Sequence, residues 1–344
     1  MALAYAVNVG SLRFANEGRD AKPLLALETE LGIGGSGGRC RIQLGDPSWG
    51  DPSLGDPIAV ELDNGDGATK VFSGEVEAVE RRSTSLWIHG RDGLAKLART
   101  EVEAVYEETA AGEIIEALIG AAGAEAGEIE QGPTFPSYVV HRGPRALRHA
   151  QKLAELIGAE LSTDGEGKVH FKLPSSGGSA DHRLAWGVDL LDLSLERALA
   201  QLDSLVVWGE GAAASQGTDK NHWLPSDLSG VTGKAKIQPG ASAGQAGSVA
   251  SGSSGELVRT VFDGAVREAS VAEELARAQA LRVALRPMIG HVLVLGHPEI
   301  QAGEWVELAD LPSGSGPSAA PTLRVLRVIH QFALGRGLLT RLEF

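Results

Sequence analysis

Residues 323–344, LRVLRVIHQFALGRGLLTRLEF, have the pattern of two β-strands joined by a short glycine turn. Side chains alternate between the two faces of a strand, so one face of the first strand carries Leu326, Val328, His330 and Phe332. The turn is Gly335-Arg336-Gly337, where glycine tolerates the positive φ that tight hairpins need. The return strand lines one face with Leu338, Thr340, Leu342 and Phe344. Because the chain ends on bulky Phe344, we expect this last strand to be paired inside a sheet.

The first hundred residues repeat this β-rich plan. Short β-prone runs separated by glycine and charge cover residues 5–9, 24–31, 39–44, 58–62 and 71–80. Gly55-Asp56 leads into Val60-Glu61-Leu62, as Gly303-Glu304 leads into Val306-Glu307-Leu308. Downstream, Val76 and Val79 have the same spacing as Val325 and Val328. The matches are short, but they indicate two similar β-units in one chain.

A helical pattern interrupts the strands in the middle of the chain. An apolar stripe follows Thr109, which we expect to cap the helix, and Gly123 can end it. A second helix is expected to open at Pro144 and to stop at Gly158. Residues 159–173 then form a predicted hairpin around the turn Asp164-Gly165. Residues near 101–173 are therefore predicted to be an α/β insertion between β-rich segments.

The second half contains a low-complexity segment and one more helix. Residues 212–255 are rich in glycine, serine and alanine and are predicted to form an exposed loop or linker. Ser270 and Glu273 fit a capping box at the start of a helix that Pro287 ends. Strands are expected to follow at 291–296 and 305–308.

Bulk properties limit the classes of function. A length of 344 residues predicts two or three domains, and 43% apolar residues are enough to bury their cores. A formal charge of -14 argues against sequence-specific nucleic-acid binding, which needs a basic patch. No run of about 18 apolar residues exists, so no membrane insertion is expected. Cys40 is the single cysteine, fits a reducing compartment of synthesis and has the pattern of a small apolar strand residue.

Two glycine patterns overlap between residues 32 and 38. Gly32, Gly34 and Gly37 match G-x-G-x-x-G, and Gly34, Ser36 and Gly38 match G-x-S-x-G. Both motifs act at a helix N-terminus, but residues 39–44 have the pattern of a strand. We therefore interpret both matches as the composition of a glycine-rich hairpin.

Three aspartates recur at a spacing of five residues, each of them directly before a proline: Asp46, Asp51 and Asp56. The regular spacing allows a calcium loop. Proline favours extended geometry in the residue before it, which would splay the carboxylates apart, so a rigid surface loop is the preferred interpretation.

Catalytic patterns are weak. The sequence has no Walker lysine, His-Glu-x-x-His motif or cysteine pair. The nine histidines are scattered; His141 and His149 flank a turn, and His330 lies on an apolar strand face, where a satisfied core histidine is the ordinary case. Carboxylates are abundant, and a pair such as Glu101 with Asp92 is one of many that could act as acid and base. No catalytic, cofactor-binding or metal-binding residue is assigned, and no cofactor is predicted.

Four blocks of residues carry a resemblance to a known family. They are Val71-Phe72-Ser73-Gly74-Glu75-Val76 with Leu86–Asp92; Leu153-Ala154 through Gly158 to Asp164–Phe171; Gly296-His297-Pro298-Glu299-Ile300 with Gly303; and Val328-Ile329-His330 to Leu339-Thr340. In this order and spacing, the sequence resembles the phage late control protein D family, the baseplate hub of contractile tails. The resemblance spans nearly the whole chain.

The resemblance implies an α+β, mainly β fold with two tail-tube-like β-barrel domains and a small inserted α/β domain. The expected division places the first barrel at residues 1–100 plus 174–211 and the inserted domain at 101–173. A Gly/Ser/Ala-rich loop is expected at 212–258, and the second barrel at 259–344. Three chains with two barrels each would present six similar barrels to a sixfold tube, while the other end keeps threefold symmetry.

The implied function is structural, without catalysis. The resemblance implies a homotrimer that joins the inner tube protein to a spike protein and contacts other baseplate components. Because the chain stops at Phe344, the spike is expected to be a separate polypeptide. The protein is expected in the cytoplasm during assembly and then in the tail or injection particle, with an acidic channel that would not retain nucleic acid.

Two alternatives stay open. The first is a tail-associated cell-wall hydrolase that uses a carboxylate pair as acid and base. The second is a free-standing oligomeric binding module that is unrelated to tails.

Overall fold

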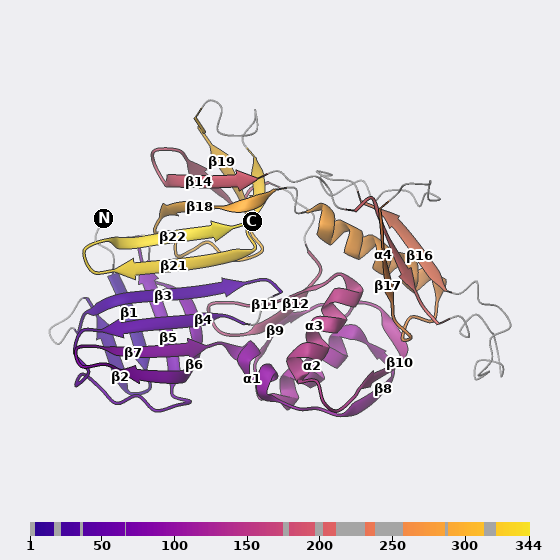
Figure 1. The fold of residues 1–344 in the computed structure, drawn as a ribbon, viewed down its shortest axis with the longest axis horizontal. Helices are drawn as coiled ribbons and strands as arrows, with labels where there is room; N and C mark the ends of the chain where they lie inside the picture. Colours follow the sequence, from indigo (N-terminus) through magenta and orange to yellow (C-terminus); the bar gives the residue numbers. More distant parts are fainter. Residues whose placement is uncertain are drawn as a thin grey trace.

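The computed structural model of the chain describes residues 4–16, 22–34, 37–65, 67–174, 179–196, 202–210, 231–237, 257–285, 288–312 and 321–344. These residues form three parts, which Figure 1 shows as two stacks of strands and a neighbouring helical region. We call them the N-terminal β-unit, the C-terminal β-unit and the α/β region.

The N-terminal β-unit consists of strands β1 to β7. Their bounds are β1 Ala4–Val9, β2 Leu12–Ala15, β3 Leu24–Gly32, β4 Arg39–Leu44, β5 Pro57–Asp63, β6 Thr69–Arg81 and β7 Leu86–Arg91. Alternate residues of β1, β4 and β5 are buried, as the period of two in their sequences requires. The fully buried side chains include Phe14, Ile42, Val60, Phe72 and Ile88, which pack into one core inside the curled sheet.

The C-terminal β-unit gathers strands from two distant stretches of the chain. They are β13 His182–Ala185, β14 Leu190–Glu196, β18 Ile289–Leu295, β19 Trp305–Ala309, β20 Thr322–Arg324, β21 Arg327–Ala333 and β22 Gly337–Glu343. Leu184 and Leu190 from the first stretch share a core with Val292, Val306 and Leu342 from the second. The predicted terminal hairpin is confirmed: β21 and β22 pair across Gly335 and Gly337, which both have positive φ.

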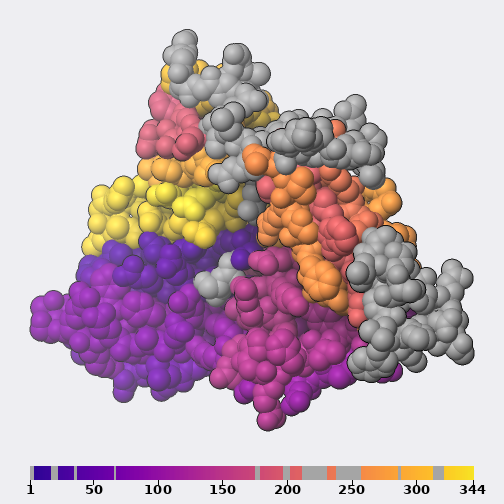
Figure 2. Space-filling view, turned by 45° about the vertical axis from the view of Figure 1, so that its right-hand side comes forward, coloured from indigo at the N-terminus to yellow at the C-terminus, as the bar shows by residue number. Residues whose placement is uncertain are grey.

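One sheet joins the two β-units. Its eleven strands run in the order β14-β18-β22-β21-β3-β4-β7-β6-β5-β1-β2, and the two units meet where β21 pairs with β3. Strands β13, β19 and β20 form a separate small sheet. Figure 2 shows the yellow C-terminal strands resting directly on the indigo and purple N-terminal β-unit. The prediction of a mainly β fold with some helices is confirmed.

The α/β region also comes from two stretches. The first contains α1 Gly93–Arg99, β8 Ala104–Ala110, α2 Ala111–Ala121, β9 Ala126–Ile129, β10 Thr134–Val140, α3 Ala146–Ile157, β11 Glu160–Thr163 and β12 Val169–Lys172. The second contains β15 Ser204–Trp208, β16 Thr232–Lys236, β17 Val258–Phe262 and α4 Ala269–Ala284. One core holds both stretches together, because Leu205, Val207 and Leu275 pack with Ile115 and Leu153. In the described residues, no helix is long and apolar enough to cross a membrane.

The ends of two predicted helices lie close to where the sequence places them. Helix α3 ends at Gly158, which has the left-handed φ of 73° that favours glycine at this position. Helix α2 begins one residue after Ala110, and Thr109 lies in β8, so Thr109 is not the cap. Helix α4 begins at Ala269 after Glu268, which leaves Ser270 inside the helix and the predicted capping box unformed.

The observed pairings differ from the expected division of the chain. Within 174–211, β13 pairs with β19 and β14 with β18, so these strands join the C-terminal β-unit instead of the first barrel. Within 259–344, α4 packs in the core of the α/β region. Part of the predicted loop at 212–258 forms β16, which pairs with β15; most of that segment lies outside the described residues. Burial of Leu184 and Leu205 in two different cores separates these segments.

Candidate functional site

The seam between the two β-units is an antiparallel strand pair. Its register runs from Arg327 opposite Gly32 to Ala333 opposite Ala26. On the inner face, the Phe332 ring lies 4.8 Å from the ring of Tyr5, whose hydroxyl accepts a hydrogen bond from the Leu24 backbone N–H. Leu338 of β22 packs in the core of the N-terminal β-unit. Both backbone and side chains therefore join the units.

Charged side chains continue across the seam on its outer face. Arg327 of β21 lies 3.3 Å from Glu30 of β3, which also pairs with Arg39 of β4 at 2.5 Å. Two residues from Glu30 along β3, Glu28 accepts a hydrogen bond of 2.9 Å from the side-chain amide of Gln331. Exposed ion pairs of this kind add little stability each, but cross-strand pairs help to fix the register.

In the N-terminal β-unit, the two residues before β5 are hydrogen-bonded to β6. We call this arrangement of Gly55, Asp56 and Val76 the corner. The Gly55 N–H donates to the carbonyl of Val76 at 2.9 Å, and the Val76 N–H donates to the carbonyl of Asp56 at 2.9 Å. The Asp56 carboxylate accepts from the Ser53 N–H at 2.8 Å. Gly55 has a φ of 86°, a left-handed conformation in which glycine is favoured.

The C-terminal β-unit contains the same corner. The Gly303 N–H donates to the carbonyl of Val325 at 2.8 Å, and the Val325 N–H donates to the carbonyl of Glu304 at 2.9 Å. The Glu304 carboxylate accepts from the Gln301 N–H at 2.7 Å. Gly303 has a φ of 102°. The short sequence match between residues 55–76 and 303–325 is therefore a match in hydrogen bonding.

The strand orders of the two units correspond as well. In the N-terminal β-unit, the order is β3-β4-β7-β6-β5-β1. In the C-terminal β-unit, β14-β18-β22-β21 belong to the large sheet and β20-β19-β13 to the separate small sheet; because β20 and β21 follow each other along the chain, together they take the place of β6. The first strand pair of each unit also has the same irregularity. The register of β3 against β4 shifts between Leu24 and Ala26, and the register of β14 against β18 shifts between Leu190 and Asp192. One difference is that β13 is parallel to β19, whereas β1 is antiparallel to β5.

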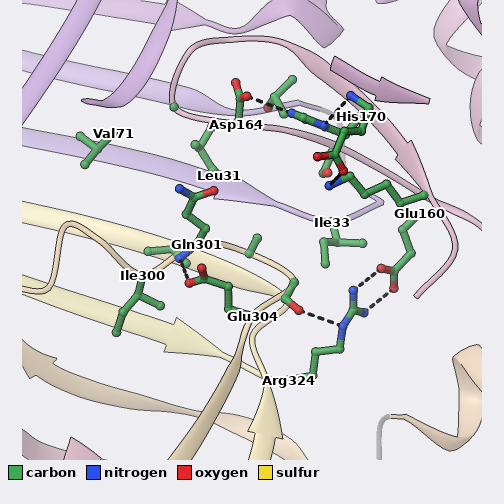
Figure 3. Close-up of a pocket in the computed structure, with 18 of the residues that line it drawn as sticks. Leu31, Ile33, Val71, Glu160, Asp164, His170, Ile300, Gln301, Glu304 and Arg324 are labelled. Carbon is green, nitrogen blue, oxygen red and sulfur yellow. Dashed lines mark hydrogen bonds and ion pairs between the residues drawn. The ribbon is translucent and has the colours of Figure 1, made fainter. Parts of the chain in front are cut away.

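A pocket of about 570 Å³ lies where the three parts of the molecule meet. Leu31 and Val71 line it from the N-terminal β-unit, and Ile300 lines it from the C-terminal β-unit. Its polar residues include Glu160, Asp164, His170, Gln301, Glu304 and Arg324, shown in Figure 3. Most of the carboxylates drawn there already have a partner within the chain, so this pocket is a packed junction of charged groups.

The strongest of these partnerships joins the α/β region to the C-terminal β-unit. Arg324 donates two hydrogen bonds to the Glu160 carboxylate, at 2.8 and 2.6 Å, and both residues are buried. Figure 3 shows the Glu160 carboxylate and the Arg324 guanidinium pointing at each other. A paired, bidentate geometry is what makes burial of two charges tolerable, because a lone buried charge is strongly destabilising.

A buried histidine lies beside this junction. The His330 ring forms a 3.0 Å hydrogen bond with the Thr340 hydroxyl, as expected for a satisfied core histidine. Burial lowers the pKa of His330 to about 4, so the ring is neutral in the folded protein near pH 7. His330 faces Thr29 across the seam, and the Thr29 hydroxyl is buried without a hydrogen-bond partner.

A glycine turn joins the α/β region to the N-terminal β-unit. A Cβ at Gly165 would lie 2.0 Å from the carbonyl oxygen of Lys70, so the turn between β11 and β12 touches the β6 backbone. Asp164 beside it bonds His170 at 2.9 Å. Burial raises the pKa of Asp164, but hydrogen bonds from His170 and from the Lys168 backbone outweigh it and hold that pKa below its usual value.

The carboxylates considered for acid–base chemistry have separate structural roles. Asp92 is buried as the N-cap of α1, accepts hydrogen bonds from the Leu94 N–H and the Thr163 hydroxyl, and has a pKa raised by burial. Glu101 is exposed and pairs with Arg145 at 3.2 Å. The geometry therefore gives each carboxylate its own partner.

The remaining sequence motifs also have structural explanations. The glycine-rich segment at 32–38 leads into strand β4 instead of a helix, and Ser36 lies outside the described residues. Asp46 bonds Ser48, Asp51 pairs with Arg81, and Asp56 holds the corner described above. Across the described residues, no group of three or more metal-binding side chains is close enough to hold an ion. His149, buried next to His141, bonds the His141 carbonyl at 3.0 Å.

Sequence reasoning missed the Glu160–Arg324 pair. The two residues are 164 positions apart, and neither has a local pattern that indicates its partner. The corner residues Gly55, Asp56, Gly303 and Glu304 did have a signal, because they stand in the short internal repeat.

Comparison with solved structures identifies the class of fold. A 43 kDa tail protein of prophage MuSo2 from Shewanella oneidensis matches with a TM-score of 0.69 and 13% identity, over 99% of this chain and 98% of that one. A tail protein from Neisseria meningitidis matches with a TM-score of 0.70 and 13% identity, over 100% and 96%. No protein-family model matches the sequence, and comparison with curated proteins finds no match.

A third structure links the fold to secretion machinery. An E. coli component of the type VI secretion system, described as similar in structure to the phage T4 tail proteins gp27 and gp5, matches with a TM-score of 0.59. It is 12% identical, over 98% of this chain and 75% of that one. The chain thus has the fold of phage tail proteins, which confirms at the level of fold the resemblance read from the sequence.

Proposed function

We propose that this chain is a structural hub in the baseplate of a contractile tail or contractile injection system. Three copies would join a sixfold inner tube to a threefold spike, with other baseplate components around them. The proposal is supported by the fold, which is similar over nearly the whole chain to that of prophage tail proteins and of a type VI secretion component.

The observation that carries the proposal is the repeated corner. The same three hydrogen bonds hold Gly55 and Asp56 to their partners in one unit and Gly303 and Glu304 in the other. We infer that the two β-units are copies of one tail-tube-like barrel, altered by later insertions. Six such barrels from three chains can follow a sixfold ring, while the α/β regions keep threefold symmetry.

The charge of the chain suits a channel through such a ring. A formal charge of -14 would repel nucleic acid and acidic cargo instead of retaining them. A strongly basic channel in the assembled particle would contradict this part of the proposal.

A purified oligomer tests the proposal. We expect a trimer by light scattering and binding to rings of the inner tube protein in pull-down. A stable monomer, or an oligomer that ignores tube rings, would contradict the proposal and favour an unrelated binding module. Lysis of peptidoglycan that is lost on replacing one carboxylate would favour the hydrolase alternative, for which the described geometry offers no support at Asp92 or Glu101.

A further inference from the structure

Besides the terminal strand β2, two strand edges of the large sheet have no strand partner within the described residues. Strand β14 pairs with β18 on one side only. Strand β6 pairs with β5 as far as Glu75, and beyond Val76 its only strand partner is β7. Both edges are exposed, at Glu80 and Arg81 of β6 and at Arg82 directly after it, and at Leu191 of β14, which is 45% exposed. Exposed strand edges are ready to pair with another chain.

These two edges correspond to the two strands that already pair in the seam. The shared register shift matches β14 to β3, with Leu190 and Asp192 in the places of Leu24 and Ala26. The shared corner matches Val76 to Val325, so the C-terminal half of β6 matches β21. The chain therefore contains one example of this strand pair, between its own two units, and carries both halves of a second example unpaired.

We propose that β14 of one copy pairs antiparallel with the C-terminal half of β6 of a second copy of this chain. This rests on the proposed function, because it repeats the intrachain seam between copies and so closes a ring. The register follows from these matches, because Arg82 corresponds to Gln331 and Ser194 to Glu28. Gln331 lies opposite Glu28 in the seam, so Arg82 of one copy would lie opposite Ser194 of the next. The interface is head to tail, since each copy offers a different edge on each side.

The side chains at these positions fit each other. Leu193 and Leu195 of β14 are only partly buried and would be covered by the added strand. Arg82 would lie opposite Ser194, with Asp192 and Glu196 as diagonal neighbours on the same face, so its positive charge would meet two carboxylates. In this register Glu80 lies directly opposite Glu196, and this unfavourable like-charge pair is offset by Arg82, which bonds Glu80 at 2.9 Å.

The far edge of the sheet provides an internal alternative. Strand β2, with Arg13 exposed, is the last strand at the other end, and an edge-to-edge contact between β14 and β2 would also extend the sheet. However, the strand that pairs with β3 in the seam matches β6 and not β2. The two contacts are distinguished by which pair of positions can be cross-linked.

Cysteine cross-linking of the full chain tests the proposed register. The single native cysteine, Cys40, is fully buried, and burial raises the pKa of its thiol, so it gives little background. We would combine Arg82→Cys with Ser194→Cys and treat the assembled protein with a short bis-maleimide. The matched control combines Arg13→Cys with Ser194→Cys. Each single variant is a further control, and thermal unfolding checks that all variants fold.

We expect covalent oligomers up to the trimer from the Arg82→Cys/Ser194→Cys chain and monomers from the controls. A mixture of the Arg82→Cys chain and the Ser194→Cys chain should give a covalent dimer, which shows that the contact is between copies. An oligomer that does not cross-link at these positions, or that cross-links through Arg13→Cys, overturns the proposed pairing but leaves the hub function intact. A chain that stays monomeric contradicts both.

A charge reversal gives a second readout that needs no cross-linker. Arg82→Glu should weaken assembly of the oligomer about tenfold or more, because the new carboxylate would face Asp192 and Glu196 and would no longer neutralise Glu80. Arg13→Glu, at the β2 edge, should leave assembly unchanged. Equal effects of the two substitutions would contradict the proposed interface.

Discussion

The two β-units share a strand order but differ at the strand that forms the seam. In the N-terminal β-unit, β6 runs unbroken from Thr69 to Arg81. In the C-terminal β-unit, the matching strand is interrupted after β20. At this interruption, the Leu326 N–H donates to the Glu343 carbonyl at 2.8 Å, and the Leu326 carbonyl accepts from the Ile33 N–H at 2.9 Å. On the two sides of this interruption, β20 pairs with β19 and β21 pairs with β3, whereas β6 changes its partners without a break.

The two β-units also differ in how they hold the α/β region. The C-terminal β-unit uses the buried pair of Arg324 and Glu160. The N-terminal β-unit uses backbone contact at Gly165, where no side chain fits. An exposed ion pair of 2.7 Å between Lys70 and Glu166 also lies at the second joint. The first joint thus depends on a buried charge pair and the second mainly on close packing, and substitutions that act on only one of them can separate the two.

The largest effect is expected at the charged joint. Arg324→Met should lower the free energy of unfolding by about 3–5 kcal/mol, because Glu160 would be left buried without a partner. The double variant Arg324→Met/Glu160→Gln should recover part of this loss. Denaturant unfolding of the wild type, both single variants and the double variant measures the coupling. Additive losses would contradict a specific pair.

The next effect concerns the seam and depends on pH. His330 has a pKa of about 4 when folded and 6.5 when unfolded, so the unfolded chain takes up a proton first. Stability should therefore fall by roughly 3 kcal/mol as the pH drops from 6.5 to 4. His330→Leu should flatten this part of the profile in thermal unfolding.

The matching position in the N-terminal β-unit provides the control for this pH effect. Arg81 stands where His330 stands, but it is exposed. Arg81→Leu should leave the slope between pH 6.5 and 5 unchanged. A slope that persists in His330→Leu would mean that other groups, among them His149, whose pKa is also lowered by burial, carry the effect.

The joint that depends on shape should respond to added volume. Gly165→Ala should cost about 1–3 kcal/mol, because its Cβ would overlap the Lys70 carbonyl oxygen and push the turn away from β6. Gly120→Ala is the matched control: Gly120 lies in α2 with open space around it, so alanine should stabilise the helix by up to about 1 kcal/mol. Equal losses at both sites would contradict close packing at Gly165.

The smallest effects test whether the two corners are equivalent. Asp56→Ala removes the acceptor for the Ser53 N–H and should cost about 1 kcal/mol. Glu304→Ala removes the acceptor for the Gln301 N–H and should cost somewhat more, because His182 also bonds Glu304 at 2.9 Å. Differential scanning calorimetry can compare the two. A large loss at one corner with none at the other would argue against equivalence.

Local features of the fold were predictable from sequence because local chemistry decides them. The alternation at 326–332 and the glycines at 335 and 337 predicted the terminal hairpin, and Gly158 marked the end of α3. The internal repeat pointed to the two corners. In each case, a backbone conformation that favours glycine, or a period of two, was visible in the sequence itself.

Long-range assignments were not predictable in the same way. Residues 182–196 alternate as any strand does, and nothing in that pattern indicates pairing with β18 and β19 across a hundred residues. Helix α4 has an apolar face that could cover several partners, yet it packs on β15 and β16. The junction pocket is assembled from all three parts, so neither its shape nor the Glu160–Arg324 pair was accessible before the structure.

Electron microscopy of the assembled oligomer tests the central claim, that one chain carries two copies of the same β-unit, most directly. The account predicts a ring of six similar β-units around a threefold axis, with three α/β regions at every second joint. The strands at the joints between copies should be β14 and β6. A ring with one β-unit per chain, or a particle without a threefold axis, would contradict the account.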